Sequence, residues 1–527
     1  MAIARRRLMQ GLLAAGLVGG CSDRSPRRSA GTAQPASATP SGRPAPSGLA
    51  PSTPAVPNWA ALHGKLAGRL LRTGDAGYDT RRLLFNRRFD AAARPAAIAV
   101  VAGPDDVRAA VRFAADNRLP LHVRAGGHSY TGASTGDGLV VDLRQLSAIS
   151  VNPNTATIGA GAGLLDVYAA LAGHGVSVPA GSCPTVGLAG LALGGGMGVV
   201  GRRYGLTCDR LAAAQVVLAD GRLLTADPSS EPDLFWALRG GGGSFGVVTS
   251  LTLRTHPTRS LAIFSLDWPW PMAAHVVDGW QRWAPAQGDA LWSTCHLLAT
   301  TEGTPSASIG GCYVGPSADL GPALAMLTAS VGSPPRGRSV RDSDYLAAMF
   351  VEAGCSGQPA AACQVGDYGR GGSLPRDAFV AASDFFTGPI PLSALEALAG
   401  AVERRQTDRS LDVGGVGFDS WGGAVSQLHP ADTAFVHRDA LFGAQYTASW
   451  ARQAGNGPQA ANQASLRSVQ APLHPYATGA AYQNYADPSL ADPQTAYYGA
   501  NLARLQLVKR RYDPDDLFHL PQGVRIG

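Results

Sequence analysis

The sequence predicts an α+β protein with two folded domains: a ligand-binding domain, and a second domain in which helices cover one face of an antiparallel sheet. Its 527 residues are enough for two or three hydrophobic cores. Glycine and proline are frequent, at 66 and 37 residues, which indicates many turns and close backbone contacts. From about residue 260, short elements give way to longer apolar, strand-like runs separated by helical stretches, as is typical of an α+β domain.

The first 21 residues resemble an export signal. Arginines at positions 5–7 precede an apolar run over 8–18, which is too short to anchor stably in a bilayer. Paired arginine before such a run resembles a twin-arginine signal, a route for proteins that fold before export. Residues 18–21 also resemble a lipoprotein cleavage site with Cys21 as the lipidated residue. We therefore expect an extracellular or envelope-attached protein; an uncleaved basic terminus is the alternative.

Residues 22–57 are predicted to be a disordered tether, and the rest of the chain carries no net charge. The tether is built of Ser, Pro, Ala, Gly and Arg, so it cannot bury enough apolar surface to order itself. The formal net charge of +6 comes from seven arginines and one aspartate within residues 1–50, and the remaining 37 basic and 37 acidic residues cancel. A nucleic acid partner is therefore not expected.

Apolar patterning predicts the elements of the first domain, which we expect over 58–257. Residues 97–101 form a strand, and Pro104 begins a helix with two aspartates in its first turn. A strand over 119–123 leads into a glycine-rich turn, and 139–143 and 157–158 add strands. Residues 164–172 form a helix that ends at nearby glycines. A hairpin turns at Asp220-Gly221 between strands over 214–218 and 222–225, and 247–253 alternates as the last strand.

The second domain is expected over 258–470, and a C-terminal segment over 471–527 is expected to return to the first domain. Apolar, strand-like runs lie at 261–268, 291–298 and 307–314, with further strand character over 434–450. Helical patterns cover 320–330 and 392–405, and a last helix is predicted over 500–511.

Two glycine-rich segments each carry one nucleophilic side chain. The first runs from Arg124 to Tyr130 and contains His128, and the second runs from Gly181 to Gly198 and contains Cys183. Glycine has no Cβ and tolerates positive φ, so such backbone can approach a ligand closely, and packed turns direct N–H groups at phosphate oxygens. Two nucleophiles beside a phosphate cradle predict a cofactor that is held covalently.

Another glycine pattern is interpreted as a coincidence. Residues 196–201 fit G-x-G-x-x-G, and Asp220 lies near the spacing of a ribose-binding acid. No buried strand is predicted to lead into Gly196, and the hairpin explains Asp220 better. A dinucleotide-binding βαβ fold is therefore not expected.

Several motifs together resemble the berberine-bridge-enzyme family of FAD-linked oxidases, which have the vanillyl-alcohol-oxidase, or PCMH-type, flavin fold. They are the His128 and Cys183 segments, the motifs at 204–209 and 236–248, and the C-terminal motifs at 482–487, 498–501 and 508–514. The resemblance spans residues 80–527, with its motifs in order across both domains. It implies a PCMH-type FAD-binding domain followed by a substrate domain, with FAD as the cofactor and no metal site.

The resemblance also implies roles for individual residues. His128 would bond the 8α methyl group of the flavin and Cys183 its C6 atom, which makes the FAD bicovalent. Tyr485 would be the catalytic base, with Tyr482 nearby, and Val186 resembles the small gatekeeper that admits O2. A tyrosine titrates near ~10, so a base role needs help from its surroundings. The other expected cofactor contacts are Arg124, Ala125, Gly126, Gly127, Ser129, Tyr130, Gly187, Gly190, Gly194, Gly195, Gly198, Gly246, Val248 and Asn484.

The remaining cysteines have structural interpretations. Export permits disulfides, and Cys355 with Cys363 is the best candidate pair because both lie in one Gly/Pro/Ala loop. Cys295 and Cys312 lie in neighbouring strand-like runs and could also pair; the sequence leaves this connectivity open. Cys208 is expected to be a small buried hydrophobe.

Other conspicuous side chains are also interpreted as structural. Phe418, Trp421 and Trp450 are expected in the core rather than as platforms for sugar rings. The run His437-Arg438-Asp439 is interpreted as a structural charge set on a sheet, not as a catalytic cluster.

Three functions are compatible with these residues. The first is an oxidase that takes hydride from an alcohol or hemiacetal carbon of a sugar, oligosaccharide or glycosylated metabolite and reduces O2 to H2O2. The second is an oxidase that tailors a secondary metabolite by dehydrogenation or oxidative cyclisation. The third is an envelope flavoprotein without catalysis, against which His128, Cys183 and Tyr485 argue. The substrate itself is not predicted, because the pocket is expected mainly over 260–450, where motifs are weakest.

Overall fold

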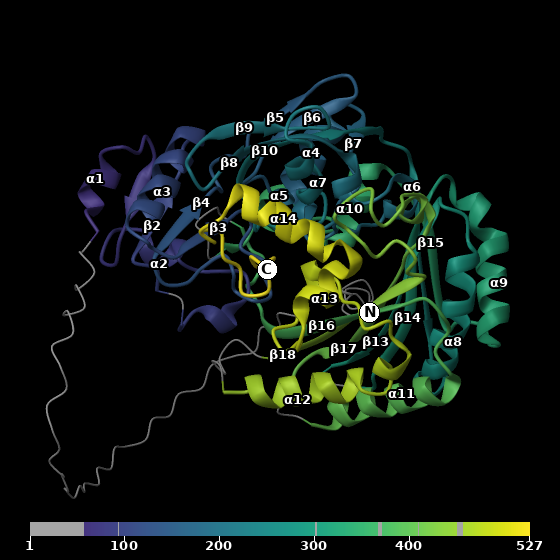
Figure 1. Cartoon of the computed structure of the whole chain (residues 1–527). Coiled ribbons are helices and arrows are strands. Elements are labelled where there is room, and N and C mark those ends of the chain that lie inside the picture. The colour runs from purple at the N-terminus through teal and green to yellow at the C-terminus, as the bar shows by residue number, and fades with distance from the viewer. Residues whose placement is uncertain (1–56, 93, 301–302, 367–371, 409–410, 451–456) are drawn as a thin grey trace, which may run out of the picture.

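One large antiparallel sheet and two smaller sheets form the frame of the molecule (Figure 1). The computed structural model describes residues 57–527 except 93, 301–302, 367–371, 409–410 and 451–456. The expected export signal, Cys21 and the tether up to residue 56 lie outside these residues. Within the described residues, no helix is long and apolar enough to cross a membrane.

The first small sheet carries the first glycine-rich segment at its edge. Its strand order is β1 (Arg69–Leu71), β2 (Ala97–Val100), β4 (Leu139–Asp142) and β3 (Leu121–Arg124). The last three strands are parallel, and β1 is antiparallel to β2. Helix α3 (Pro104–Asp116) starts at the predicted proline and connects β2 to β3, with β4 lying between them in the sheet. Strand β3 then delivers the chain into the segment that holds His128.

The second small sheet is antiparallel and contains the predicted hairpin. Its order is β5 (Ile149–Val151), β6 (Thr155–Gly159), β10 (Val247–Arg254), β8 (Leu211–Val217) and β9 (Leu223–Ala226). Gly221 in the β8–β9 turn has φ +76°, and Asp220 Oδ1 accepts a hydrogen bond from the Arg222 N–H at 2.9 Å. Asp220 therefore serves a turn, as expected. A short ribbon of β7 (Val176–Ser177) and β11 (His256–Pro257) follows beside this sheet.

The large sheet has seven antiparallel strands, and helices cover the face that points away from the small sheets (Figure 1). Its order is β15 (Gly337–Ser343), β12 (Leu261–Trp268), β14 (Ser306–Val314), β13 (Leu291–Ala299), β17 (Gly414–Ser420), β18 (Phe442–Trp450) and β16 (Ala378–Phe386). The covering helices are α8 (Ala273–Trp283), α9 (Gly321–Val331), α11 (Leu392–Thr407) and α12 (Gln459–Gln470). The predicted α+β class, with helices on one face of an antiparallel sheet, is confirmed.

The remaining helices are short, and several connect the two halves of the molecule. Helix α10 packs on α4, and the C-terminal α14 (yellow in Figure 1) packs on α7 in the first half. Their bounds are α1 Trp59–His63, α2 Tyr78–Arg81, α4 Leu164–Ala172, α5 Leu188–Leu193, α6 Gly201–Tyr204, α7 Pro232–Ala237, α10 Tyr345–Glu352, α13 Pro493–Tyr498 and α14 Leu502–Tyr512.

The cysteines agree with the sequence analysis in one pair and differ in the other. Cys355 and Cys363 form a disulfide, and Cys208 is a fully buried free thiol. The possible pairing of Cys295 with Cys312 is wrong, and both thiols are free. They lie on adjacent strands, but Cys295 faces Ile309 and Cys312 faces Trp292. Their side chains also enter different cores, because an odd register offset places them on opposite faces of the sheet.

The aromatic residues and the charge set at 437–439 behave as structural groups. Phe418, Trp421 and Trp450 are at most 2% exposed, which confirms their core interpretation. The placement of the charge set on a sheet is wrong, however: strand β18 starts only at Phe442, and the charged residues lie in the loop before it.

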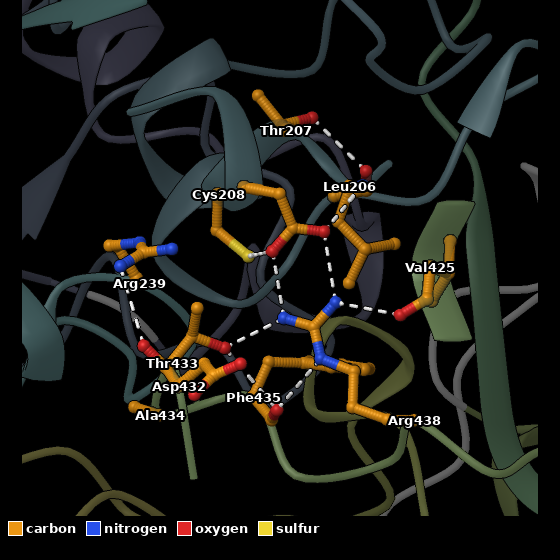
Figure 2. Close-up of polar contacts among 12 residues, drawn as sticks. Leu206, Thr207, Cys208, Arg239, Val425, Asp432, Thr433, Ala434, Phe435 and Arg438 are labelled. Atoms are coloured by element: carbon orange, nitrogen blue, oxygen red, sulfur yellow. Dashed lines mark hydrogen bonds and ion pairs between the residues drawn. The ribbon is translucent and has the colours of Figure 1, made fainter. Parts of the chain in front are cut away.

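Arg438 in this loop clamps the two halves of the chain together (Figure 2). Its guanidinium donates to both carboxylate oxygens of Asp209 at 2.7 and 2.9 Å, and to the Thr433 hydroxyl at 2.7 Å. The neighbouring Cys208 N–H donates to the carbonyl of Gly195 at 2.8 Å. The buried ion pair between Arg438 of the second half and Asp209 of the first half therefore holds the segment that supports the second glycine-rich loop.

Candidate active site

A cavity of about 360 Å³ lies where the two glycine-rich segments, the large sheet and the C-terminal segment meet. Nearly all of the expected site residues line it: Ala125, Gly126, Gly127, His128, Ser129, Tyr130, Cys183, Val186, Gly187, Gly190, Gly194, Gly198, Gly246, Val248, Tyr482, Asn484 and Tyr485. They come from sequence positions more than 350 residues apart, so the tertiary fold assembles them around one space.

Two expected contacts lie outside this cavity wall. The Arg124 side chain is fully buried behind it, and its guanidinium donates to the backbone carbonyls of Ser134, Arg81 and Arg82. Gly195 packs against the ring of Phe435, which a Cβ there would approach to 3.0 Å. Both residues shape the loops that form the cavity and do not line it.

Glycine allows the two segments to touch each other through their backbones. A Cβ on Gly126 would lie 2.2 Å from the backbone nitrogen of Gly187, and a Cβ on Gly187 would lie 2.4 Å from that of Gly126. A Cβ on Gly194 would lie 2.1 Å from Asn484 Oδ1. By contrast, Gly190 has no neighbour within 4 Å of such a Cβ. Most of these glycines are therefore required for contact between segments, and only some give a ligand room.

The backbone of the first segment offers hydrogen-bond donors. Within the part of the chain that the structure describes, the N–H groups of Gly127, His128 and Ser129 donate to no protein acceptor. These residues line the cavity, so their N–H groups are available to a ligand, and consecutive N–H groups in a tight turn suit an anion. The turn and the glycine-lined space beside it fit the diphosphate and flavin of FAD.

His128 is a neutral, immobilised imidazole. Its ring stacks on Phe85 at a centroid distance of 4.1 Å, and its Nε2 lies 3.0 Å from the Thr185 hydroxyl oxygen. Burial lowers the pKa of His128 to about 3, against an opposing hydrogen bond that the ring donates to the Thr185 backbone. A neutral imidazole has one free lone pair, so the ring is a nucleophile at neutral pH.

Cys183 lies on the opposite segment and is partly exposed to the cavity. Burial raises the pKa of its thiol to about 11, so the thiol is protonated at neutral pH. A bond from its sulfur therefore requires that the proton be removed first, because the thiolate is the nucleophile.

The oxygen of Tyr482 holds the second glycine-rich loop. It accepts hydrogen bonds from the N–H groups of Gly196 at 2.9 Å and Met197 at 3.1 Å, and from Asn484 Nδ2 at 2.9 Å. Asn484 Nδ2 also donates to the Leu191 carbonyl at 3.0 Å. The pKa of Tyr482 rises to about 12 because burial outweighs these donors. This geometry favours a structural role for Tyr482 and the expected supporting role for Asn484.

Tyr485 faces the cavity between two other tyrosines. Its ring is nearly parallel to that of Tyr130 at 6.2 Å and is edge-on to Tyr482 at 4.9 Å. Burial raises the pKa of Tyr485 well above its usual range, and the charge of Asp419 raises it further. Tyr485 is thus a neutral phenol at neutral pH.

Three polar or aromatic residues of the large sheet complete the cavity, and motif analysis missed them. Trp292 on β13, Asp419 on β17 and Gln445 on β18 line it, and Gln445 Nε2 donates to the Tyr130 hydroxyl at 2.9 Å. Burial raises the pKa of Asp419 to about 7. Gln445 is a polar side chain within the strand character expected over 434–450, and this signal could have identified it, whereas Asp419 follows a glycine-rich run that gave no such signal.

The fold and the cavity define a flavoprotein, and comparison with known proteins identifies its family. The FAD binding domain family matches residues 95–227, and the family described as berberine and berberine like matches residues 481–525. The FAD-linked oxidoreductase YgaK of Bacillus subtilis is 33% identical over 469 residues, covering 87% of this chain and 97% of its own length. The chitooligosaccharide oxidase of Gibberella zeae is 31% identical over 82% of this chain and 87% of its own. The chain belongs to the berberine-bridge-enzyme-like family of FAD-linked oxidoreductases.

Solved structures agree with this assignment. The xylooligosaccharide oxidase of Myceliophthora thermophila in complex with xylobiose superposes with a TM-score of 0.79 at 28% identity, covering 90% of this chain and 100% of that one. A glucooligosaccharide oxidase of Acremonium strictum, described as holding 6-S-cysteinyl, 8α-N1-histidyl FAD, superposes with a TM-score of 0.77 at 25% identity, over 88% and 99% of the two chains. The expected PCMH-type flavin fold and FAD-dependent oxidoreductase activity are therefore confirmed.

Proposed function

We propose that this enzyme is an exported oxidase that takes hydride from an alcohol or hemiacetal carbon of a sugar, oligosaccharide or glycosylated metabolite. The observation that carries the proposal is the polar set Tyr130, Asp419, Gln445 and Tyr485 on one cavity with His128 and Cys183. A substrate with several hydroxyl groups matches such a set, since each hydroxyl can both donate and accept. Relatives named as chitooligosaccharide and xylooligosaccharide oxidases support this substrate class.

His128 and Cys183 would hold the FAD through bonds to the 8α methyl group and C6 of its ring. Support comes from the presence of both side chains in the lining of one cavity and from the relative described as carrying both linkages. When bound, the flavin supplies the acceptor for the hydride and the route for two electrons to O2. Gly126, Gly127, Gly187, Gly190 and their neighbours would receive its diphosphate, with Gly246 and Val248 beside the ribityl or adenine part. Val186 would keep the O2 path open.

The proton of the substrate hydroxyl would pass to Tyr485 and from there to Asp419. Because the pKa of Tyr485 lies well above 10, its phenolate is too rare at neutral pH to act as a standing base. Asp419, with a pKa of about 7, is about half ionised at that pH and can accept a proton. Its charge raises the pKa of Tyr485, so the two groups interact inside the cavity. Tyr485 thus relays the proton that Asp419 finally holds.

Peroxide release tests the proposal. Purified enzyme is assayed for H2O2 with chito-, xylo- and gluco-oligosaccharides, glycosylated metabolites and aglycone alcohols, with Tyr485→Phe as the control. Sugar-dependent peroxide that the control loses is the expected result. Turnover of an aglycone alone would instead favour a tailoring oxidase of secondary metabolism. Bound flavin that no compound reduces would indicate a flavoprotein without catalysis.

Denaturation tests the covalent flavin separately. Intact mass and visible absorbance are recorded after acid precipitation. We expect yellow polypeptide heavier by one FAD, retention of flavin in the single variants His128→Ala and Cys183→Ala, and its loss in the double variant. A colourless wild-type polypeptide with free flavin in the supernatant would contradict the bicovalent attachment.

Export and domain boundaries form a separate part of the proposal, supported by sequence pattern alone. Residues 1–21 would direct export, 22–57 would tether the enzyme, and Cys21 would carry a lipid. The FAD domain would span 58–257, the substrate domain 258–470 and the returning segment 471–527. Fractionation of cells that express the full chain or Cys21→Ser tests this: envelope attachment that the variant loses supports lipidation, and retention of both in the cytoplasm contradicts export.

A further inference from the structure

Thr185 makes a contact with His128 that neither cofactor binding nor hydride transfer requires. Its hydroxyl oxygen lies 3.0 Å from His128 Nε2, within hydrogen-bond distance of the ring. Thr185 does not line the cavity, so its side chain acts through the histidine and not on a ligand. Phe85 stacks on the ring at 4.1 Å and holds its plane, and a flip that exchanged the two nitrogens would lose the contact with Thr185.

The protonation of the imidazole decides which nitrogen can react. A neutral imidazole carries a proton on one nitrogen and a lone pair on the other, and the hydrogen bond at one nitrogen selects the tautomer. The backbone of Thr185 also forms a hydrogen bond that favours a proton on this ring and raises the pKa of His128 against burial. Thr185 thus presents hydrogen-bond acceptors to the ring, and a proton on Nε2 satisfies them.

Resting on the covalent attachment proposed above, we propose that Thr185 is the positioning residue for the histidyl bond. Its hydroxyl accepts the Nε2 proton of His128 and leaves the lone pair of Nδ1 for the flavin. The relative described as holding 8α-N1-histidyl FAD is linked through a defined ring nitrogen, and Thr185 explains how this chain would select one.

Nδ1 of His128 forms a C–N bond to the 8α carbon, which loses one proton, and Nε2 loses the other to solvent through Thr185. The two electrons released by forming this bond reduce the flavin ring, which takes up two protons. O2 then accepts the two electrons and two protons as H2O2 and restores the oxidised ring.

The test isolates the histidyl bond in a Cys183→Ala background, where it is the one remaining attachment expected. Thr185→Val removes the hydroxyl at nearly constant volume, and Thr185→Ser keeps it. Each protein is produced flavin-free, mixed with FAD, and sampled for acid-stable flavin on the polypeptide by intact mass. Non-covalent FAD binding, measured by flavin fluorescence, and the thermal midpoint report on a purely structural effect.

We expect Thr185→Val to attach FAD about tenfold more slowly than Thr185→Ser, because the variant lacks the hydroxyl that accepts the Nε2 proton and passes it on, and keeps only the backbone of Thr185 beside the ring. Non-covalent binding and the thermal midpoint should stay unchanged, and NMR of the ¹⁵N-histidine flavin peptide should show substitution at Nδ1. The proposal would be overturned by any of three results: equal attachment rates for Thr185→Val and Thr185→Ser, a loss of non-covalent FAD binding that parallels the loss of attachment, or substitution at Nε2. Absence of acid-stable flavin in Cys183→Ala itself would overturn the histidyl bond too, while peroxide release by the wild type would leave the oxidase function standing.

Discussion

Replacement of Asp419 by asparagine should lower activity and raise stability at the same time. Asp419 is 8% exposed, and burial raises its pKa from 3.8 to about 7. The folded state therefore binds this proton more tightly than the unfolded chain does. Asp419 thus favours folding below pH ~4, and this contribution is lost as the pH rises to about 7. Asparagine has nearly the same shape and does not titrate, so it escapes this loss.

The size of the stability effect follows from the two pKa values. At about 1.4 kcal/mol per pKa unit, the raised pKa of Asp419 lowers the free energy of unfolding by about 4 kcal/mol at pH 8 and by roughly 2 kcal/mol at pH 5. The stability gain of Asp419→Asn should therefore grow by about 2–3 kcal/mol between pH 5 and pH 8. For a chain of this length, the rise in thermal midpoint that Asp419→Asn causes should therefore be about 2–3 °C larger at pH 8 than at pH 5.

The activity effect has the opposite sign. If Asp419 finally holds the substrate proton, kcat/KM of the wild type should rise with pH through about 7, where the carboxylate forms. Asp419→Asn should lose this rise and fall by roughly 10²–10⁴-fold. Differential scanning fluorimetry measures the stability and peroxide assays measure the activity, each from pH 5 to 9. Asp439→Asn is the control, because Asp439 is exposed. A variant that keeps its activity and shows a pH-independent stability difference would refute the reasoning.

Three further changes separate chemistry from structure. Tyr485→Phe should abolish turnover while flavin content and thermal midpoint stay as in the wild type; a turnover loss below tenfold would count against the proton relay through Tyr485. Tyr482→Phe should instead destabilise by roughly 2–5 kcal/mol, because two backbone N–H groups lose their acceptor, and unfolding curves with unchanged midpoints would contradict this. Arg438→Met should cost about 3–5 kcal/mol by leaving Asp209 charged and buried, whereas the exposed Arg525→Met should change stability by less than about 0.5 kcal/mol; equal effects in denaturant unfolding would disprove the clamp.

Local patterning predicted the elements whose signal is contained in one segment. The helix at 164–172 agrees with α4 (Leu164–Ala172), and the strand at 261–268 agrees with β12 (Leu261–Trp268). Strand β16 (Ala378–Phe386) was missed because it is buried on both faces and shows no alternation. Strand β17 (Gly414–Ser420) was missed because its glycines mimic a turn, although they allow close contact with its neighbours.

The candidate site likewise contains residues that a local motif predicts and residues that no motif predicts. His128 and Cys183 stand in glycine-rich motifs, and motif order alone indicated that both serve one cofactor. Asp419 and Gln445 stand in no motif, and they reach the cavity because antiparallel register turns them to the same face of the sheet. Arg124 shows the converse: its motif suggested a cofactor contact, yet its guanidinium is occupied by three backbone carbonyls behind the cavity.

The sequence by itself determined the flavoprotein family and the α+β class, and it predicted His128, Cys183 and Tyr485 as site residues, because the motifs that carry these inferences are each encoded by residues close together in the chain. Tertiary structure alone decided which side chains share the cavity and what charge they carry. Both depend on burial: packing against distant segments moves the pKa of Asp419 to about 7 and that of His128 to about 3. Desolvation acts through everything that surrounds a group, and a linear motif records only its nearest neighbours.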